Sequence, residues 1–135
     1  MTEKVSARGN LLDTHTAIFA MAHSKVLSAE AKAAVAAGPN LLSIVSYWEV
    51  MLKSMKGTLE VGDPRIWWQE ALEQLNATAL MLRPEHVSAI HNLPPIHKDP
   101  FDRMLIAQAT AEGLALVSSD GNIARYASKS LRVIR

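Results

Sequence analysis

Five carboxylates lie where the chain is expected to pass between a strand and a helix. They are Asp13, Glu49, the pair Asp99 and Asp102 in "HKDPFDRMLIAQA", and Asp120 in "VSSDGN". Carboxylates that share one cleft raise one another's pKa unless a cation is present. Hard oxygen ligands without a histidine or cysteine ligand spacing suit Mg²⁺ or Mn²⁺ rather than zinc. Such a site can activate a water molecule and stabilise the leaving oxygen in phosphodiester cleavage.

Each acid, taken alone, also has a structural explanation. The candidate caps and turns are Asp13 before Thr14, the capping box of Ser46 and Glu49, Asp99 before Pro100, Asp102 in a first helical turn, and Asp120 before Gly121. Glu49 is the exception to a simple cap, because "YWEVML" is an apolar neighbourhood in which an unpaired carboxylate is costly to bury. The metal hypothesis therefore depends on whether the fold brings the acids together.

Short apolar runs alternate with helical patterns along the whole chain. Strands are predicted over 10–14, 41–45, 77–82, 114–119 and 131–135, and helices over 14–22, 28–38, 46–57, 63–76, 84–93 and 99–113, with a short helical turn over 121–127. This alternation indicates βαβ units and a mostly parallel sheet covered on both faces. Ligands of such sheets bind outside the carboxyl ends of the strands, which is where most of the acids fall.

The composition is that of a globular protein. The chain has 135 residues, 49% hydrophobic and 20% charged, so we expect a single domain over 1–135. It has no cysteine, and "MTEKVSARGN" lacks the apolar core of a signal peptide, so we expect a cytoplasmic protein. The net charge is only +1, but residues 121–135 carry four basic residues and no acid, which is typical of a solvated face and compatible with a polyanion at one edge.

Four stretches, "LLDTH", "SYWEV", "KDPFDRMLIAQA" and "LVSSDGNIARY", follow one another in the order and at about the spacing seen in PIN-domain ribonucleases. The sequence resembles most closely the VapC-like toxins of type II toxin–antitoxin systems. This resemblance implies a PIN-like three-layer α/β sandwich with a mostly parallel sheet of about five strands. It also implies a ribonuclease that uses Mg²⁺ or Mn²⁺, a cognate antitoxin and a homodimer.

The same resemblance assigns roles to individual residues. The family's acids fall on Asp13, Glu49, Asp102 and Asp120, and Asp99 is a further ligand, a group that holds water, or only the helix cap. The remaining candidates are Ser118 or Ser119 as the hydroxyl before the last acid, Arg103 as a phosphate contact or an ion-pair partner, and His15 in the cleft. We expect His86 and His91 on the surface and His97 in a loop.

The tryptophans and methionines have two interpretations. Trp48, Trp67 and Trp68 can stack on bases, but their helical spacing favours core or interface positions. Met51, Met55, Trp67 and Leu72 can instead form a groove for a partner peptide.

Two rival functions remain open. A phospho-acceptor signalling domain also has an acidic pocket on a parallel sheet, but it needs adjacent acids near the N-terminus and a late lysine at a strand end. Here Asp13 stands alone, and Lys129 falls between a helix and a strand. The second rival is a catalytically idle PIN fold that only binds protein.

Overall fold

The computed structural model describes residues 8–135. Residues 1–7 lie outside the described residues; they belong to the N-terminal segment on which the expectation of a cytoplasmic protein partly depends. The strands are β1 (Asn10–Leu12), β2 (Asn40–Ser43), β3 (Ala77–Leu80), β4 (Ala115–Val117) and β5 (Val133–Ile134). The α-helices are α1 (Thr14–Ala22), α2 (Ala29–Ala37), α3 (Ile44–Met55), α4 (Pro64–Gln74), α5 (Pro84–Ala89), α6 (Pro100–Glu112) and α7 (Gly121–Ala124). Two 3₁₀ segments, Ser24–Val26 and Ile90–Asn92, complete the described elements.

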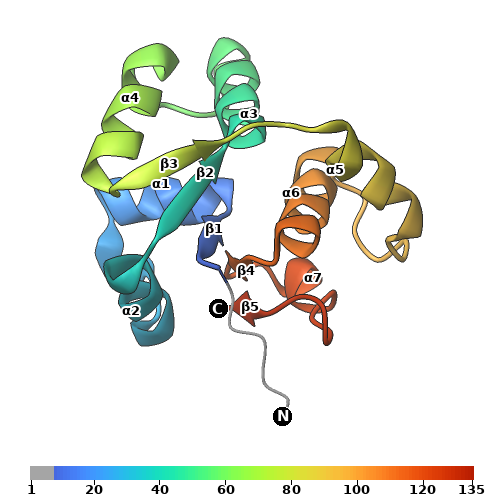
Figure 1. Ribbon diagram of the computed structural model, residues 1–135. Coiled ribbons are helices and arrows are strands. Elements are labelled where there is room, and N and C mark those ends of the chain that lie inside the picture. Colours follow the sequence, from blue (N-terminus) through green and yellow to red (C-terminus); the bar gives the residue numbers. More distant parts are fainter. Residues whose placement is uncertain (1–7) are drawn as a thin grey trace.

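The five strands form one parallel sheet in the order β3-β2-β1-β4-β5, with β1 at its centre (Figure 1). Side chains alternate between the faces along each strand. Leu11 and Leu116 therefore pack into one core with residues of α6 and α7, whereas Leu12 and Val117 pack into a second core with residues of α1, α2 and α4. This arrangement confirms the expected three-layer sandwich.

Local sequence signals explain where most helices begin and end. The Ser28 hydroxyl accepts the N–H of Ala31 at 3.0 Å and starts α2, and Asp63 precedes Pro64 at the start of α4. Helix α6 begins after Asp99 and ends at Gly113, whose φ of 69° is accessible to glycine at little cost. The element types agree with the prediction, and most boundaries differ by one to three residues.

The junction between β2 and α3 corrects the sequence prediction. The helix begins at Ile44, because the Ser43 side chain caps it by accepting the N–H of Val45 at 3.0 Å. Ser46 is therefore inside the helix, where its hydroxyl lies within hydrogen-bond distance of the Thr14 hydroxyl, at 2.9 Å. The capping box considered for Ser46 and Glu49 is therefore not formed, and the carboxylate of Glu49 contacts other residues instead.

His86 is also placed differently from the prediction. It is completely buried between α5 and α6 rather than on the surface, whereas His91 is exposed as expected. Its Nδ1 accepts the backbone N–H of Arg83 at 3.0 Å, and its Nε2 lies 2.7 Å from a carboxylate oxygen of Glu112. Both ring nitrogens have partners, so the imidazole can be buried at low cost.

Among the described residues, no helix combines the length and the apolar character that a membrane span requires.

Candidate active site

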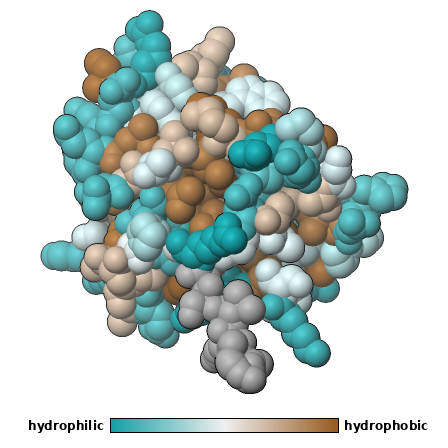
Figure 2. Space-filling model, in the orientation of Figure 1, coloured by the Kyte–Doolittle hydropathy of each residue, from teal (hydrophilic) through white to brown (hydrophobic). Residues whose placement is uncertain are grey.

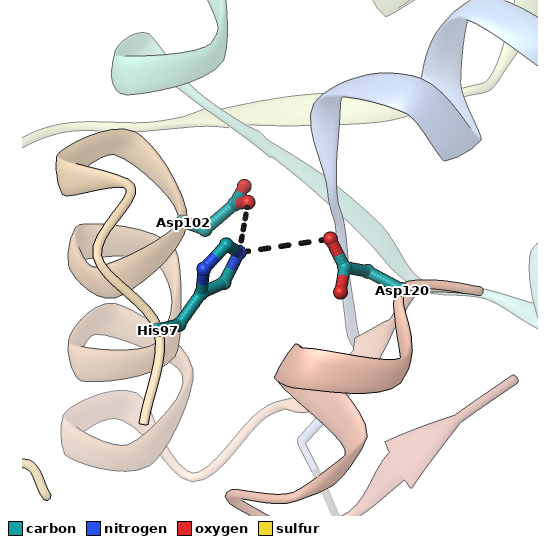
Figure 3. Close-up of side chains that lie close together, drawn as sticks. All are labelled: His97, Asp102 and Asp120. Carbon is teal, nitrogen blue, oxygen red and sulfur yellow. Dashed lines mark hydrogen bonds and ion pairs between the residues drawn. The ribbon is translucent and has the colours of Figure 1, made fainter. Parts of the chain in front are cut away.

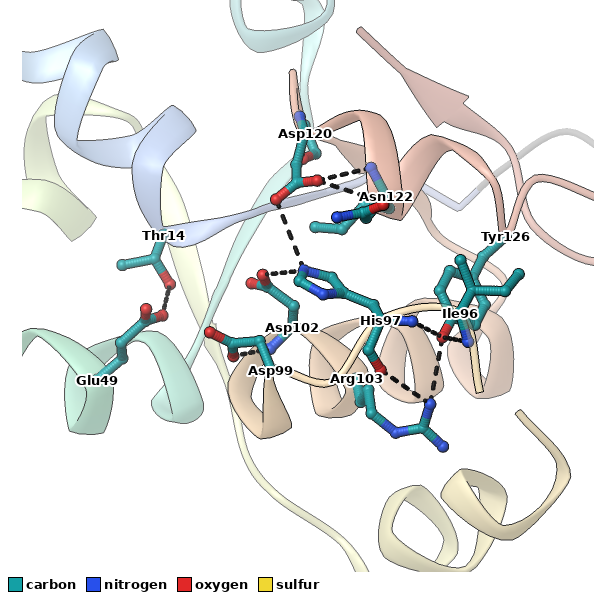
Figure 4. A network of polar contacts seen from close by, with 12 residues as sticks. Thr14, Glu49, Ile96, His97, Asp99, Asp102, Arg103, Asp120, Asn122 and Tyr126 are labelled. Carbon is teal, nitrogen blue, oxygen red and sulfur yellow. Dashed lines mark hydrogen bonds and ion pairs between the residues drawn. The ribbon is translucent and has the colours of Figure 1, made fainter. Parts of the chain in front are cut away.

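The five acids come from four segments that meet beyond the carboxyl ends of the central strands. Asp13 directly follows β1, and Asp120 lies three residues after the end of β4. Glu49 projects from the middle of α3, and Asp99 and Asp102 stand at the start of α6 (Figure 4). This is the edge at which parallel sheets bind their ligands.

His97, Asp102 and Asp120 form the most compact part of the cluster (Figure 3). The His97 Nε2 lies 2.8 Å from Oδ2 of Asp102 and 3.6 Å from Oδ2 of Asp120. One donor atom from each of the three residues lies within 4.8 Å of the others. One nitrogen therefore faces two carboxylates from different elements, α6 and the loop after β4.

The electrostatics of Asp102 show that further acids are close. Burial, together with the charges of Asp99, Glu49 and Asp13, raises the pKa of Asp102 to about 6, although the hydrogen bond to His97 lowers it. Asp102 thus lies in the field of three other carboxylates. A divalent cation would relieve this repulsion, so the chemistry of the donor set fits such an ion.

Asp13 and Asp120 are joined through Ser118. Burial raises the pKa of Asp13, and hydrogen bonds from Ser118 and Thr16 lower it. The Ser118 hydroxyl also accepts the backbone N–H of Asp120 at 3.1 Å. Ser118 is 1% exposed, whereas Ser119 faces solvent. Of the two serines considered, the structure brings only Ser118 to the acids.

Glu49 is buried but fully paired. Its Oε1 accepts a hydrogen bond from the Thr14 hydroxyl at 2.7 Å, and its Oε2 accepts one from Lys53 Nζ at 2.6 Å. The bond to Glu49 raises the pKa of Lys53 against the effect of burial, and Asp99 and Asp102 raise it further. Lys53 is a neighbour of the site that the sequence interpretation missed, although its i,i+4 spacing from Glu49 is a signal that could have found it.

The two remaining candidates, Arg103 and His15, have different surroundings in the structure. The Arg103 guanidinium donates to the carbonyl oxygens of Pro94 and His97 at 3.0 and 3.2 Å, and it forms no ion pair with an acid within residues 8–135. Arg103 therefore anchors the loop before α6; of its two proposed roles, the ion pair is not formed within residues 8–135, and the phosphate contact stays a prediction. His15 is exposed and lies beside Phe19, with ring centroids 6.3 Å apart, and its charge is one of the causes that lower the pKa of Asp13.

Asp99 has the geometry of a helix cap. Its Oδ1 accepts the backbone N–H of Asp102 at 3.0 Å, and Pro100 follows at the first helical position. Asparagine can make the same hydrogen bond, so if the chain cleaves RNA, as the family resemblance implies, we expect Asp99→Asn to retain most of that activity, measured as the initial rate on a single-stranded RNA. Asp99→Ala is expected to lose about 1 kcal/mol of unfolding free energy. If Asp99→Asn is as inactive as a variant of Asp102, Asp99 has a chemical role that the cap does not explain.

Comparisons with known proteins agree with this architecture. The PIN domain family matches residues 11–129. No curated protein sequence matches the chain. Among solved structures, a toxin–antitoxin complex from Klebsiella pneumoniae matches with 20% identity and a TM-score of 0.62, covering 93% of this chain and 96% of that one.

Two further solved structures share the fold. VapBC2 from Rickettsia felis, bound to a DNA fragment from its promoter, matches with 13% identity and a TM-score of 0.65, covering 92% of this chain and 96% of that one. VapBC-5 from Mycobacterium tuberculosis matches with 16% identity and a TM-score of 0.60, covering 93% and 97%. Since the family match spans most of the sequence, the chain belongs to the PIN-domain family.

Proposed function

We propose that this chain is a metal-dependent endoribonuclease toxin that hydrolyses RNA phosphodiester bonds and is neutralised by a cognate antitoxin. The observation that carries the proposal is the environment of Asp102. It faces His97 and Asp120, and its pKa is raised by burial and by three further acids. The similar structures from Klebsiella pneumoniae and Mycobacterium tuberculosis, a toxin–antitoxin complex and a member of a toxin–antitoxin family, support the toxin assignment.

In this mechanism Asp13, Asp102 and Asp120 would hold Mg²⁺ or Mn²⁺, and Ser118 fixes Asp13 and Asp120 relative to each other. The ion, when bound, would lower the pKa of a water molecule and stabilise charge on the scissile phosphate. The carboxylate of Glu49, oriented by Thr14 and Lys53, would accept the proton of the attacking water, and solvent would protonate the leaving oxygen. We also propose that the protein is cytoplasmic, which is consistent with RNA as the proposed substrate.

The purified chain, incubated with end-labelled single-stranded RNAs, tests this function. Cleavage is expected with Mg²⁺ or Mn²⁺, none is expected with excess EDTA, and added metal should restore it. A chain that binds metal but leaves every RNA intact would instead be an idle PIN fold acting as a protein-binding module.

The phospho-acceptor alternative finds less support in the structure. Lys129, the late lysine that it would require, lines a cavity with Gly9, Asn10 and Ala115. Asn10 and Ala115 begin β1 and β4, so this cavity lies at the amino ends of the strands, opposite the acids. Asp13 would therefore lack that lysine.

The partner surface is proposed on α3 and α4. Trp67 and Trp68 are 6% and 8% exposed and belong to the core, so Trp67 does not line a groove. Trp48, Met55 and Ile66 are exposed by 58%, 76% and 57%. On the face seen in Figure 2, apolar surface lies in patches separated by hydrophilic side chains. We propose that α3 and α4 contact an antitoxin or a second copy of the chain; light scattering of the isolated chain distinguishes the homodimer from a monomer.

A further inference from the structure

His97 lies in a loop, yet its ring is directed into the acid cluster. Its side chain is only 15% exposed, and Figure 3 shows the imidazole between Asp102 and Asp120. Sequence reasoning placed it in a loop without a chemical role, because no second histidine stands at a metal-ligand spacing. Its position therefore requires an explanation that goes beyond the four-acid set.

The backbone of His97 is fixed by contacts outside the acid cluster. Its N–H donates to the Tyr126 hydroxyl at 2.9 Å, and its carbonyl accepts from Arg103 at 3.2 Å. Figure 4 shows the Tyr126 hydroxyl beside the backbone of His97. Tyr126 is buried, and its hydroxyl donates to the carbonyl of Pro94 at 2.8 Å. The loop is thus tied to α6 and to the segment after α7, which holds the imidazole in place.

The distances around His97 are close to those between neighbouring ligands of one ion. Octahedral ligands at about 2.1 Å from a metal are separated from their neighbours by about 3 Å. The His97 Nε2 lies 2.8 Å and 3.6 Å from the Oδ2 atoms of Asp102 and Asp120. These three atoms can therefore contact one cation after small shifts of the side chains.

We propose that His97 is a nitrogen ligand of the metal, and that it makes this site select Mn²⁺ over Mg²⁺. The proposal rests on the metal-dependent function proposed above and decides between its two candidate ions. Mg²⁺ takes oxygen ligands and waters, whereas imidazole binds first-row transition metals better. Nε2 would present its lone pair to the ion, with the ring proton on Nδ1.

Electron spin-echo spectroscopy of the protein loaded with Mn²⁺ tests the ligand directly. We expect a nitrogen coupling that changes when the histidines are labelled with ¹⁵N and that disappears in His97→Asn. His91→Asn is the matched control, since His91 is exposed and lies outside the cluster. Competition titrations should show that His97→Asn lowers Mn²⁺ affinity by about 10- to 100-fold, with a smaller loss for Mg²⁺.

The outcomes separate this inference from the function on which it rests. Mn²⁺ that binds without nitrogen coupling, with the same preference over Mg²⁺ in His97→Asn, would overturn the ligand role and leave the metal nuclease standing. Failure of the wild-type protein to bind either ion would overturn the metal-dependent function as well. Circular dichroism checks the fold of His97→Asn, and if that variant unfolds, the spectrum of the labelled wild-type protein decides alone.

Discussion

Asp102→Asn is expected to lower RNA cleavage by more than about 100-fold while leaving the protein at least as stable as the wild type. The substitution removes a negative charge from a position where burial and three other acids oppose it. The asparagine oxygen can still accept a hydrogen bond from His97, so the packing of α6 is retained. Initial cleavage rates and melting temperatures of the two proteins, measured without and with Mn²⁺, test this result.

The stability difference should depend on pH. The pKa of Asp102 is raised from 3.8 to about 6, so the folded protein holds this proton more tightly than the unfolded chain. Ionisation of Asp102 therefore destabilises the metal-free fold, by an amount that is absent below about pH 4 and complete above about pH 6. The melting temperature of Asp102→Asn should exceed that of the wild type increasingly across this window. A constant difference, or wild-type cleavage by the variant, would contradict the role given to Asp102.

Glu49→Gln is expected to lower the cleavage rate by more than about tenfold. Glutamine can still accept the Thr14 hydroxyl hydrogen bond, but it cannot accept a proton from water. Lys53 is 38% exposed and can turn to solvent, so the change in unfolding free energy should stay within about 1 kcal/mol. Rate and urea-unfolding measurements separate the two effects.

Glu70→Gln on α4 serves as the control for this variant, because Glu70 is an exposed acid. It should change neither rate nor stability. If Glu49→Gln cleaves RNA like the wild type, the role of Glu49 is structural: it binds the Thr14 hydroxyl and the Lys53 ammonium group.

The fold could be predicted because its signals are local. Asp63 before Pro64, and Asp99 with Gly113 at the two ends of α6, mark helix boundaries through hydrogen bonds made within a few residues. The predicted start of α3 differs from the observed one because Ser43 and Ser46 are both residues that can cap a helix. Only the packing of the following turn decides between them.

The surroundings of the acids could not be derived in the same way. His86 and His97 acquire their roles from partners on other elements, Glu112 and Asp120 respectively, and no spacing along the chain encodes those contacts. The family resemblance pointed to the acids, but it gave no position for the imidazole of His97. Tertiary packing thus determines which polar residues stand beside the carboxylates.

The central place of β1 has a consequence for the protein's own synthesis. Leu12, next to Asp13, pairs with Val117, so the middle of the sheet is completed only when β4 has emerged from the ribosome. Asp120 follows that strand, and a nascent chain that stops short of it has one wall of the site missing. If the proposed activity is correct, the nascent chain stays inactive until β4 and the turn with Asp120 have emerged from the ribosome and folded. The order of the strands thus makes the activity depend on the synthesis of β4 and of the turn that carries Asp120.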